Sequence, residues 1–270
     1  MKPLPFAKVV GSGNDFILID ARRRASPAIS AVKVRSWCNR KRGIGADGLL
    51  LVTPSRRGDA RMRIFNADGS EASSCGNGLR CVAWYLYNHD HGKRAMSLET
   101  GAGVVNARII GRERVRILMT APRKLHLGLQ LSVRGKKHQI HSVDTGVPHA
   151  VMLVPSLEKV DLCCLGPAVR WHKRFKPSGT NVDVLRIDSP HKAAVRTYER
   201  GVEGETLACG TGAVASVVIG AALGRLKPPV SVKTASREAL EIGFRQSRTP
   251  WEGLYLEGPA RILFEGSSLL

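Results

Sequence analysis

The chain has 270 residues, of which 43% are hydrophobic and 24% charged, a balance typical of globular proteins and not of disordered ones. It contains no run of about 18 apolar residues, so no membrane span is expected, and its amino terminus does not follow the pattern of a secretory signal. The formal net charge is +20, but the clusters at Arg22-Arg23-Arg24, Arg40-Lys41-Arg42 and Arg56-Arg57 lack interleaved aromatic residues and are interpreted as solvated surface.

Short apolar segments separated by turn residues predict a series of strands in the first half of the chain. These segments are residues 6–10, 16–20, 48–52, 62–65, 104–110 and 115–119. A short surface helix is predicted over 31–40, and a nearly apolar helix over 79–88.

The second half has the same texture. Its predicted strands are residues 149–154, 181–187, 193–198, 230–234, 254–258 and 261–266. A short surface helix is predicted over 165–175 and a nearly apolar one over 213–226. A helix that is apolar on all faces must be enclosed, so each apolar helix is expected inside a curled sheet.

These patterns predict an α+β fold with two pseudo-repeated domains, each a curled, barrel-like mixed β-sheet around a central apolar helix. The boundary is placed near the stretch 121–128. The first domain is expected to span 1–122, to which the C-terminal segment 262–270 could add, and the second to span 123–261. Each domain then contains one of two similar cysteine motifs.

The two motifs are Cys75-Gly76-Asn77-Gly78 and Cys209-Gly210-Thr211-Gly212, about half the chain apart. One such motif alone usually marks a tight turn with a small buried residue. Two copies at this spacing favour a shared chemical role. The glycines leave the backbone N–H groups of the first helical turn open to a carboxylate, and the same partial positive charge stabilises a thiolate.

Two such helix starts facing each other would hold one α-carboxylate, with one sulfur on each face of the adjacent carbon. One thiolate could remove the α-proton while the opposing thiol delivers a proton to the other face. The stereocentre would be inverted. Fixed backbone donors would stabilise the negative charge that develops during the reaction.

Six segments, in this order along the chain, resemble the motif set of the diaminopimelate epimerase family: GSGNDF, GIGADGLLL, FNADGSEASSCGNGLRC, TGVPH, GTNVDV and YERGVEGETLACGTGA. The resemblance covers most of the chain. It implies a cofactor-independent isomerase that interconverts LL- and meso-2,6-diaminopimelate in lysine and peptidoglycan precursor biosynthesis. It also implies two α/β domains, each with a curled sheet around a central helix, and an active site in the interdomain cleft.

By this resemblance, Cys75 and Cys209 are the two acid/base thiols, His149 sets the protonation of the first and Glu199 is paired with the second. The resemblance also assigns substrate-binding residues. Those expected at the distal end of the substrate are Asn14, Asn66, Asn181 and Arg200, and those expected at the reacting carboxylate are Gly76, Asn77, Gly210 and Thr211. Glu199 is expected to contact substrate as well.

Two positions depart from the family pattern. Val147 stands where many members have an asparagine, and Gly48 stands where some have a ligand-binding glutamine. Recognition of the distal end of the substrate is therefore predicted less firmly than the chemistry.

Two other functions are considered. One is a cofactor-independent racemase of another amino acid, such as proline or a histidine or glutamate-like substrate, on the same fold. Arg200 with Asn66 and Asn181 favours a substrate with a second charged end. The other is a basic nucleic-acid-associated protein that retains the fold, which the intact set of site residues disfavours.

The resemblance and the cysteine pattern complete the expectations. No two of the six cysteines have Cys-x-x-Cys spacing, so reduced thiols and no metal site are expected. No cofactor is expected. The protein is expected to be a cytoplasmic homodimer that binds the small molecule diaminopimelate, without a membrane or specific nucleic-acid partner.

Overall fold

The computed structural model describes residues 3–23, 26–245 and 251–268. The chain divides into two compact units. Unit 1 consists of Met1–Leu118 and Glu257–Leu270, and unit 2 consists of Met119–Leu256. The final segment of the chain therefore belongs to the first unit.

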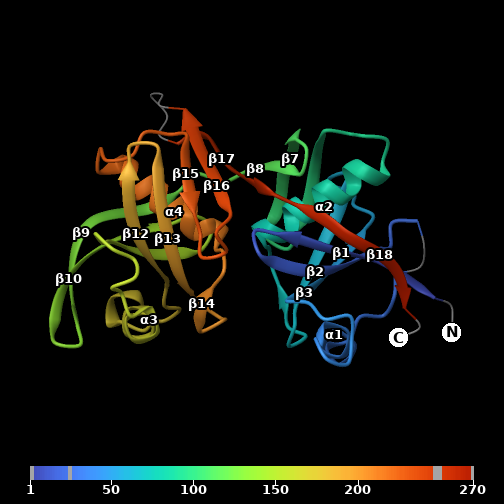
Figure 1. Cartoon of the computed structure of the whole chain (residues 1–270), viewed down its shortest axis with the longest axis horizontal. Coiled ribbons are helices and arrows are strands. Elements are labelled where there is room, and N and C mark those ends of the chain that lie inside the picture. Colours follow the sequence, from blue (N-terminus) through green and yellow to red (C-terminus); the bar gives the residue numbers. More distant parts are fainter. Residues whose placement is uncertain (1–2, 24–25, 246–250, 269–270) are drawn as a thin grey trace. The chain divides into compact units, whose positions relative to one another are not determined.

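Unit 1 contains a mixed sheet and two helices (Figure 1). Its elements are β1 (Leu4–Gly11), β2 (Asn14–Asp20), α1 (Ala31–Cys38), β3 (Gly48–Thr53), β4 (Ala60–Asn66), β5 (Glu71–Ala72), α2 (Gly76–His89), β6 (Ala95–Thr100), β7 (Gly103–Gly111), β8 (Arg114–Leu118) and β18 (Arg261–Ser268). Strand β17 (Glu252–Pro259) leads into β18 and pairs with β8.

Two parallel strand pairs interrupt the otherwise antiparallel sheet of unit 1. The pairing runs β18, β1, β2, β3, β4, β6, β7, β8, and only β2 with β3 and β4 with β6 are parallel. A parallel pair needs a crossover connection. Helix α1 is part of the first crossover and helix α2 of the second.

Unit 2 repeats this order. Its elements are β9 (Arg123–Val133), β10 (Lys136–Asp144), β11 (Pro148–Leu153), α3 (Leu162–Arg170), the 3₁₀ turn η1 (Lys173–Phe175), β12 (Asn181–Ser189), β13 (Lys192–Glu199), β14 (Gly204–Thr206), α4 (Gly210–Ala222), β15 (Val230–Lys233) and β16 (Ala239–Arg245). Strands β11 and β12 are parallel across α3, and β13 and β15 are parallel across α4. The predicted pseudo-repeat of curled mixed sheets is confirmed, although the sheets are not closed into barrels.

Helices α2 and α4 are the central helices of their units. Helix α4 contacts four consecutive strands, β10 to β13, and β16, and its residues from Gly212 to Gly220 are all buried. Helix α2 contacts strands that include β1, β2, β3 and β18 (Figure 1). It is buried from Asn77 to Ala83 but exposed at Asn88 and His89, so α2 is less completely enclosed than α4.

One predicted helix has other bounds in the structure, and one strand was missed near the predicted domain boundary. The stretch 121–128, near which the domain boundary is predicted, contains the first half of β9, whose side chains are mostly exposed and give no strand pattern. The helix predicted over 165–175 begins earlier, at Leu162, where the side chain of Asp161 caps it by accepting from the Cys164 N–H. It ends at Arg170, and a separate 3₁₀ turn follows.

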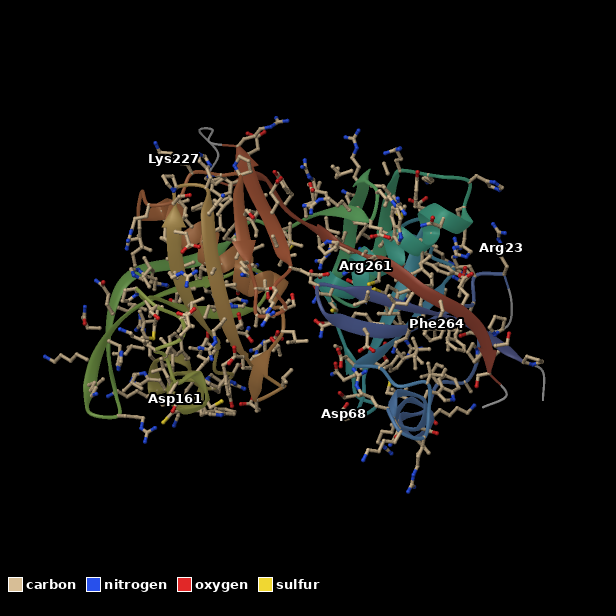
Figure 2. All side chains as sticks on the ribbon, viewed as in Figure 1. Arg23, Asp68, Asp161, Lys227, Arg261 and Phe264 are labelled. Carbon is tan, nitrogen blue, oxygen red and sulfur yellow. The ribbon has the colours of Figure 1, made fainter. Side chains whose placement is uncertain are left out.

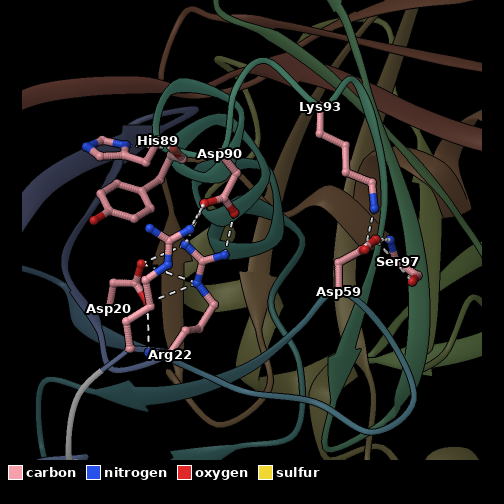
Figure 3. Close-up of polar contacts among 9 residues, drawn as sticks. Asp20, Arg22, Asp59, His89, Asp90, Lys93 and Ser97 are labelled. Atoms are coloured by element: carbon pink, nitrogen blue, oxygen red, sulfur yellow. Dashed lines mark hydrogen bonds and ion pairs between the residues drawn. The ribbon is translucent and has the colours of Figure 1, made fainter.

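Ion pairs fix the C-terminal end of α2 in unit 1. The guanidinium of Arg22 donates to the carboxylates of Asp20 and Asp90, and Lys93 pairs with Asp59 (Figure 3). The side chain of Arg22 is only 14% exposed, so its interpretation as solvated surface was wrong. Its neighbour Arg23 is 79% exposed (Figure 2), and Arg24 lies outside the described residues.

Among the residues that the structure describes, no helix combines the length and apolarity needed to cross a membrane.

Candidate active site

Cys75 lies at the start of α2 in unit 1. It is the N-cap residue, with extended backbone angles, and its sulfur accepts a hydrogen bond of 3.4 Å from the N–H of Gly78. Gly76 and Asn77 follow as the first two helical residues. The thiol therefore lies at the positive end of the helix dipole, where a thiolate or a carboxylate is stabilised.

A chain of side-chain amides fixes this helix start to the first strands. Asn77 is 4% exposed, and its Nδ2 donates to Oδ1 of Asn14 over 2.6 Å. Nδ2 of Asn14 in turn donates to Asp47 over 3.3 Å. The structure thus joins Asn14 and Asn77, two of the predicted substrate-binding residues, to the helix that carries Cys75.

Asn66 and Gly48 lie opposite each other where β4 ends and β3 begins. The side chain of Asn66 donates to Ser70 in the turn that follows. A Cβ atom at Gly48 would lie 2.6 Å from the carbonyl oxygen of Phe65, so a glutamine at this position would require a backbone shift. Glycine is therefore a packing requirement of this chain at position 48.

Cys209 occupies the equivalent place in unit 2, as the N-cap residue of α4. It is 8% exposed, and its sulfur lies 3.4 Å from Oγ1 of Thr211. Gly210 is the first helical residue. The two predicted cysteines therefore begin the two equivalent central helices, as the Gly-x-Gly motifs predict.

His149 is completely buried on β11 and is held by a buried carboxylate. Its Nδ1 lies 2.7 Å from Oδ2 of Asp183, and Oδ1 of Asp183 accepts from the hydroxyl of Thr197 over 2.7 Å. With Nδ1 donating to the carboxylate, the neutral imidazole presents Nε2 as its acceptor. Asp183 therefore selects the tautomer of His149.

Glu199 ends β13 beside Cys209. Its carboxylate accepts hydrogen bonds from the hydroxyl of Thr206 and from the thiol of Cys209. In unit 2 the structure thus brings together three of the four predicted catalytic residues.

Asn181 and Arg200 are joined through the backbone. Oδ1 of Asn181 accepts from the Arg200 N–H over 2.8 Å, and its Nδ2 donates to the Pro148 carbonyl over 3.1 Å. Nδ2 also lies 3.5 Å from Nε2 of His149. The amide of Asn181 thereby fixes the loop after β13 next to the predicted catalytic residues.

Burial and negative charge both favour the protonated form of Cys209. Burial raises the pKa of its thiol well above the ordinary value, and the charges of Glu199 and Asp183 raise it further. Burial also raises the pKa of Glu199, while its hydrogen bonds from Thr206 and Cys209 act in the opposite direction. At neutral pH Cys209 is therefore a thiol that can donate a proton.

This protonation state can be measured by alkylation, because only the thiolate reacts. The rate at which iodoacetamide modifies Cys209 should reach half of its plateau only above about pH 9, whereas in the urea-unfolded chain the half-plateau should lie at the ordinary thiol pKa of about 8.5. Mass spectrometry of the Cys209 peptide gives the rates. Low exposure slows the reaction at every pH without moving its midpoint, so a midpoint at or below that of the unfolded chain would contradict this assignment.

Asp183 and Arg80 were not among the predicted residues. A signal for Asp183 was available, since Asn181 and Asp183 are polar residues two apart that alternate with Val182 and Val184 and so share a face. Arg80 interrupts an apolar helix pattern in the same way. Within the described parts of the chain, no group of three or more His, Cys, Asp or Glu side chains could hold a metal ion.

A family model described as "Diaminopimelate epimerase" matches residues 6–125 and 141–263. Among curated relatives, the diaminopimelate epimerase of Chlorobaculum tepidum is 41% identical over 265 residues, which cover 96% of this chain and 99% of the relative. That of Carboxydothermus hydrogenoformans is 38% identical over 281 residues, 99% of this chain and 100% of the relative. That of Aquifex aeolicus is 39% identical over 274 residues, 97% of each chain.

Solved structures share the fold at much lower identity. A phenazine biosynthesis protein of the PhzF family from Bacillus anthracis has a TM-score of 0.74 at 16% identity and covers 100% of both chains. A probable proline racemase from Agrobacterium radiobacter K84 has a TM-score of 0.73 at 17% identity, over 99% of this chain and 93% of the other. These two proteins are similar to this chain in fold.

Proposed function

The chain belongs to the diaminopimelate epimerase family, and we propose that Cys75 and Cys209 are the acid–base pair of its reaction. The protein is a pyridoxal-phosphate-independent isomerase that interconverts LL- and meso-2,6-diaminopimelate, a step of lysine biosynthesis. The observation that supports the cysteine assignment is their equivalence. Each is the N-cap residue of the central helix in one copy of the repeat.

In the proposed reaction, the Cys75 thiolate removes the α-proton of the substrate and becomes a thiol. The Cys209 thiol gives its proton to the opposite face of the same carbon and becomes a thiolate. One C–H bond breaks and another forms, so the configuration inverts with no net change in protons. The reverse reaction begins from the opposite pair of protonation states, with Cys209 as the base.

The surroundings of Cys209 suit its role as the acid in the direction in which Cys75 is the base. Glu199 and Asp183 disfavour its thiolate. When Cys209 has lost its proton, the thiolate lies beside the Glu199 carboxyl, whose own protonated form is favoured by burial. The pairing of His149 with Cys75 joins residues of different units and stays a prediction from the family resemblance.

The reacting carboxylate is proposed to bind the first-turn N–H groups of α2 and α4, at Gly76, Asn77, Gly210 and Thr211. These groups also stabilise the charge that develops on the carboxylate when the α-proton leaves. For the distal end we propose Asn14, Asn66, Asn181 and Arg200. The guanidinium of Arg200 matches a carboxylate in a two-pronged hydrogen bond.

The direct test incubates purified, reduced protein with LL-2,6-diaminopimelate and follows the appearance of the meso isomer by chiral chromatography. We expect conversion without added pyridoxal phosphate or metal, and unchanged rates after treatment with a chelator. Proline, glutamate and histidine serve as parallel substrates. Racemisation of one of these with no turnover of diaminopimelate would favour the alternative racemase.

Assembly and location are inferred from the resemblance. We propose a cytoplasmic homodimer without a specific nucleic-acid partner. The exposed apolar side chains of Leu263 and Phe264 on β18, at 54% and 51%, are compatible with such a contact between copies, and Figure 2 places Phe264 on that strand. Sedimentation velocity at several protein concentrations would give the oligomeric state.

A further inference from the structure

Arg80 is a fully buried cation inside unit 1. It lies in the second turn of α2, five residues after Cys75, and its side chain is 0% exposed. A buried charge is costly unless hydrogen bonds compensate it. Such a residue in an otherwise apolar helix therefore requires an explanation beyond packing.

The guanidinium donates to oxygens from three separate segments. Nη2 donates to Oγ of Ser12 over 2.7 Å and to Oδ1 of Asn77 over 2.6 Å. Nε donates to the carbonyl of Pro259 over 3.3 Å, and Nη1 to the carbonyl of Gly76 over 3.4 Å. All four of these acceptors are uncharged oxygens.

Arg80 determines the orientation of two amides. Since Oδ1 of Asn77 accepts from the guanidinium, Nδ2 of Asn77 must point to Asn14, to which it donates. Oδ1 of Asn14 is then the acceptor, and its Nδ2 donates to Asp47. Without Arg80 the amide of Asn77 could rotate by half a turn, and the order of donors and acceptors along the chain would be lost.

The repeat shows that this cation is specific to unit 1. Five residues after Cys209, the position equivalent to Arg80 is occupied by Val214, which is completely buried. The charges that act on Cys209 are the carboxylates of Glu199 and Asp183. The two equivalent helix starts therefore differ: a buried arginine follows Cys75, whereas a buried valine follows Cys209 and two carboxylates act on its thiol.

Four charged side chains near the start of α2 are paired with one another. Asp15 forms ion pairs with Lys8 and Arg40, each over 2.7 Å, and Arg40 also pairs with Asp47. Lys8 and Asp15 lie on β1 and β2, which α2 contacts. This neighbouring cluster balances its own charges, with two cations and two carboxylates.

We propose that Arg80 is a positioning residue of the catalytic centre: its buried guanidinium orients the amides of Asn77 and Asn14 and holds positive charge at the start of α2, where Cys75 and the substrate carboxylate become or remain anionic. The inference rests on the proposed function of Cys75. It assigns the free protein a thiolate at Cys75 and a thiol at Cys209, which are the protonation states from which Cys75 acts as the base and Cys209 as the acid.

The test measures the protonation of Cys75 directly, apart from catalysis. Variants Arg80→Met, which removes the charge, and Arg80→Lys, which keeps it, are alkylated with iodoacetamide across a pH series, and the Cys75 peptide is quantified by mass spectrometry. In Arg80→Met we expect the Cys75 midpoint to rise by about one pH unit, so that alkylation below the midpoint slows about tenfold. In Arg80→Lys the rate should stay within about threefold of the parent protein.

Two controls separate this effect from loss of structure. The Cys209 profile in the same sample should not move. Arg170→Met removes another buried arginine, the partner of Glu203 in unit 2, and should leave the Cys75 profile unchanged. If Arg80→Met does not fold by circular dichroism, Arg80→Gln replaces it, because glutamine is neutral and can still donate to Ser12.

A folded, neutral variant with the parent Cys75 profile would overturn the proposal, whether or not the protein epimerises diaminopimelate. Conversely, the Cys75 profile could shift in Arg80→Met although the parent protein does not turn over diaminopimelate. That result would support the role of Arg80 and overturn the proposed function of Cys75. The two failures are therefore distinguishable.

Discussion

Replacing either Cys75 or Cys209 by alanine should lower the rate of epimerisation by several orders of magnitude, because neither partner of an acid–base pair can complete the reaction alone. Conversion of LL- to meso-diaminopimelate by the purified variants gives the size of the loss. Serine should be nearly as poor as alanine, since a hydroxyl is a far weaker acid than a thiol.

Two other cysteines provide matched controls. Cys81 is buried in the same helix as Cys75, and Cys163 is exposed on α3. Alanine at either position should leave the turnover number within a fewfold of the parent. Near-normal epimerisation by the Cys75 or Cys209 variant would exclude the two-thiol mechanism.

The same mechanism makes an isotopic prediction. In heavy water, early in the reaction, the product should contain deuterium at the α-carbon while the returned substrate stays mostly unlabelled, because each thiol keeps its own proton. A single base serving both faces would label the two pools alike. Mass spectrometry of the separated isomers distinguishes these outcomes.

Asp183→Asn should lower the turnover number by roughly 10²-fold or more, as expected when the residue that orients a catalytic histidine is changed. The amide can keep the hydrogen bond from Thr197 through Oδ1, but it then presents Nδ2 to the ring of His149. The ring must accept at Nδ1 and carry its proton on Nε2. The midpoint of Cys209 alkylation should fall in this variant, since one of the two carboxylates that raise the pKa of the thiol is gone.

Gly212→Ala also tests the contact between Asp183 and His149, because Gly212 on α4 packs against the carboxylate of Asp183. A Cβ atom there would lie 2.3 Å from Oδ1 of Asp183 and 2.9 Å from Oγ1 of Thr197, so the carboxylate would have to move. Gly220→Ala is the matched control near the other end of α4, where the added atom would meet the side chain of Leu226 at 2.4 Å. We expect loss of turnover only in the first. Full activity in both Asp183→Asn and Gly212→Ala would show that His149 does not depend on this carboxylate.

Much of this architecture could be predicted because local signals agree with the fold. The apolar helices, the glycines after Cys75 and Cys209, and the half-chain spacing all follow from short-range chemistry. The hairpin of β9 and β10 could not be predicted from the sequence, because most side chains of β9 are exposed and the apolar–polar alternation of a strand is absent. Its pairing depends on the neighbouring strand and not on its own sequence.

The roles of Asp183 and Arg80 could not be predicted from the sequence for a different reason. Asp183 and Arg80 act through partners far away in the chain, His149 and Thr197 for the first, Ser12 and Pro259 for the second. A polar residue among apolar ones signals that a partner exists but does not identify it. The departure at Gly48 is similar, since only the structure reveals the nearby carbonyl of Phe65.

The return of residues 257–270 to unit 1 has a consequence for biosynthesis. Strand β1 needs β18 along one edge, with Leu4 opposite Ser268, and Glu257 forms ion pairs with Arg114 and Arg116. The ribosome makes these late residues only after all of unit 2. Nascent unit 1 therefore waits with an uncovered strand edge, a surface that favours aggregation.

Unit 2, by contrast, is one continuous segment, Met119–Leu256, and can fold once it has left the ribosome. Domains usually fold in the order in which they are synthesised. In this protein the order is reversed: the second unit can complete its core first, and the segment that emerges last closes the core of the unit that began the chain.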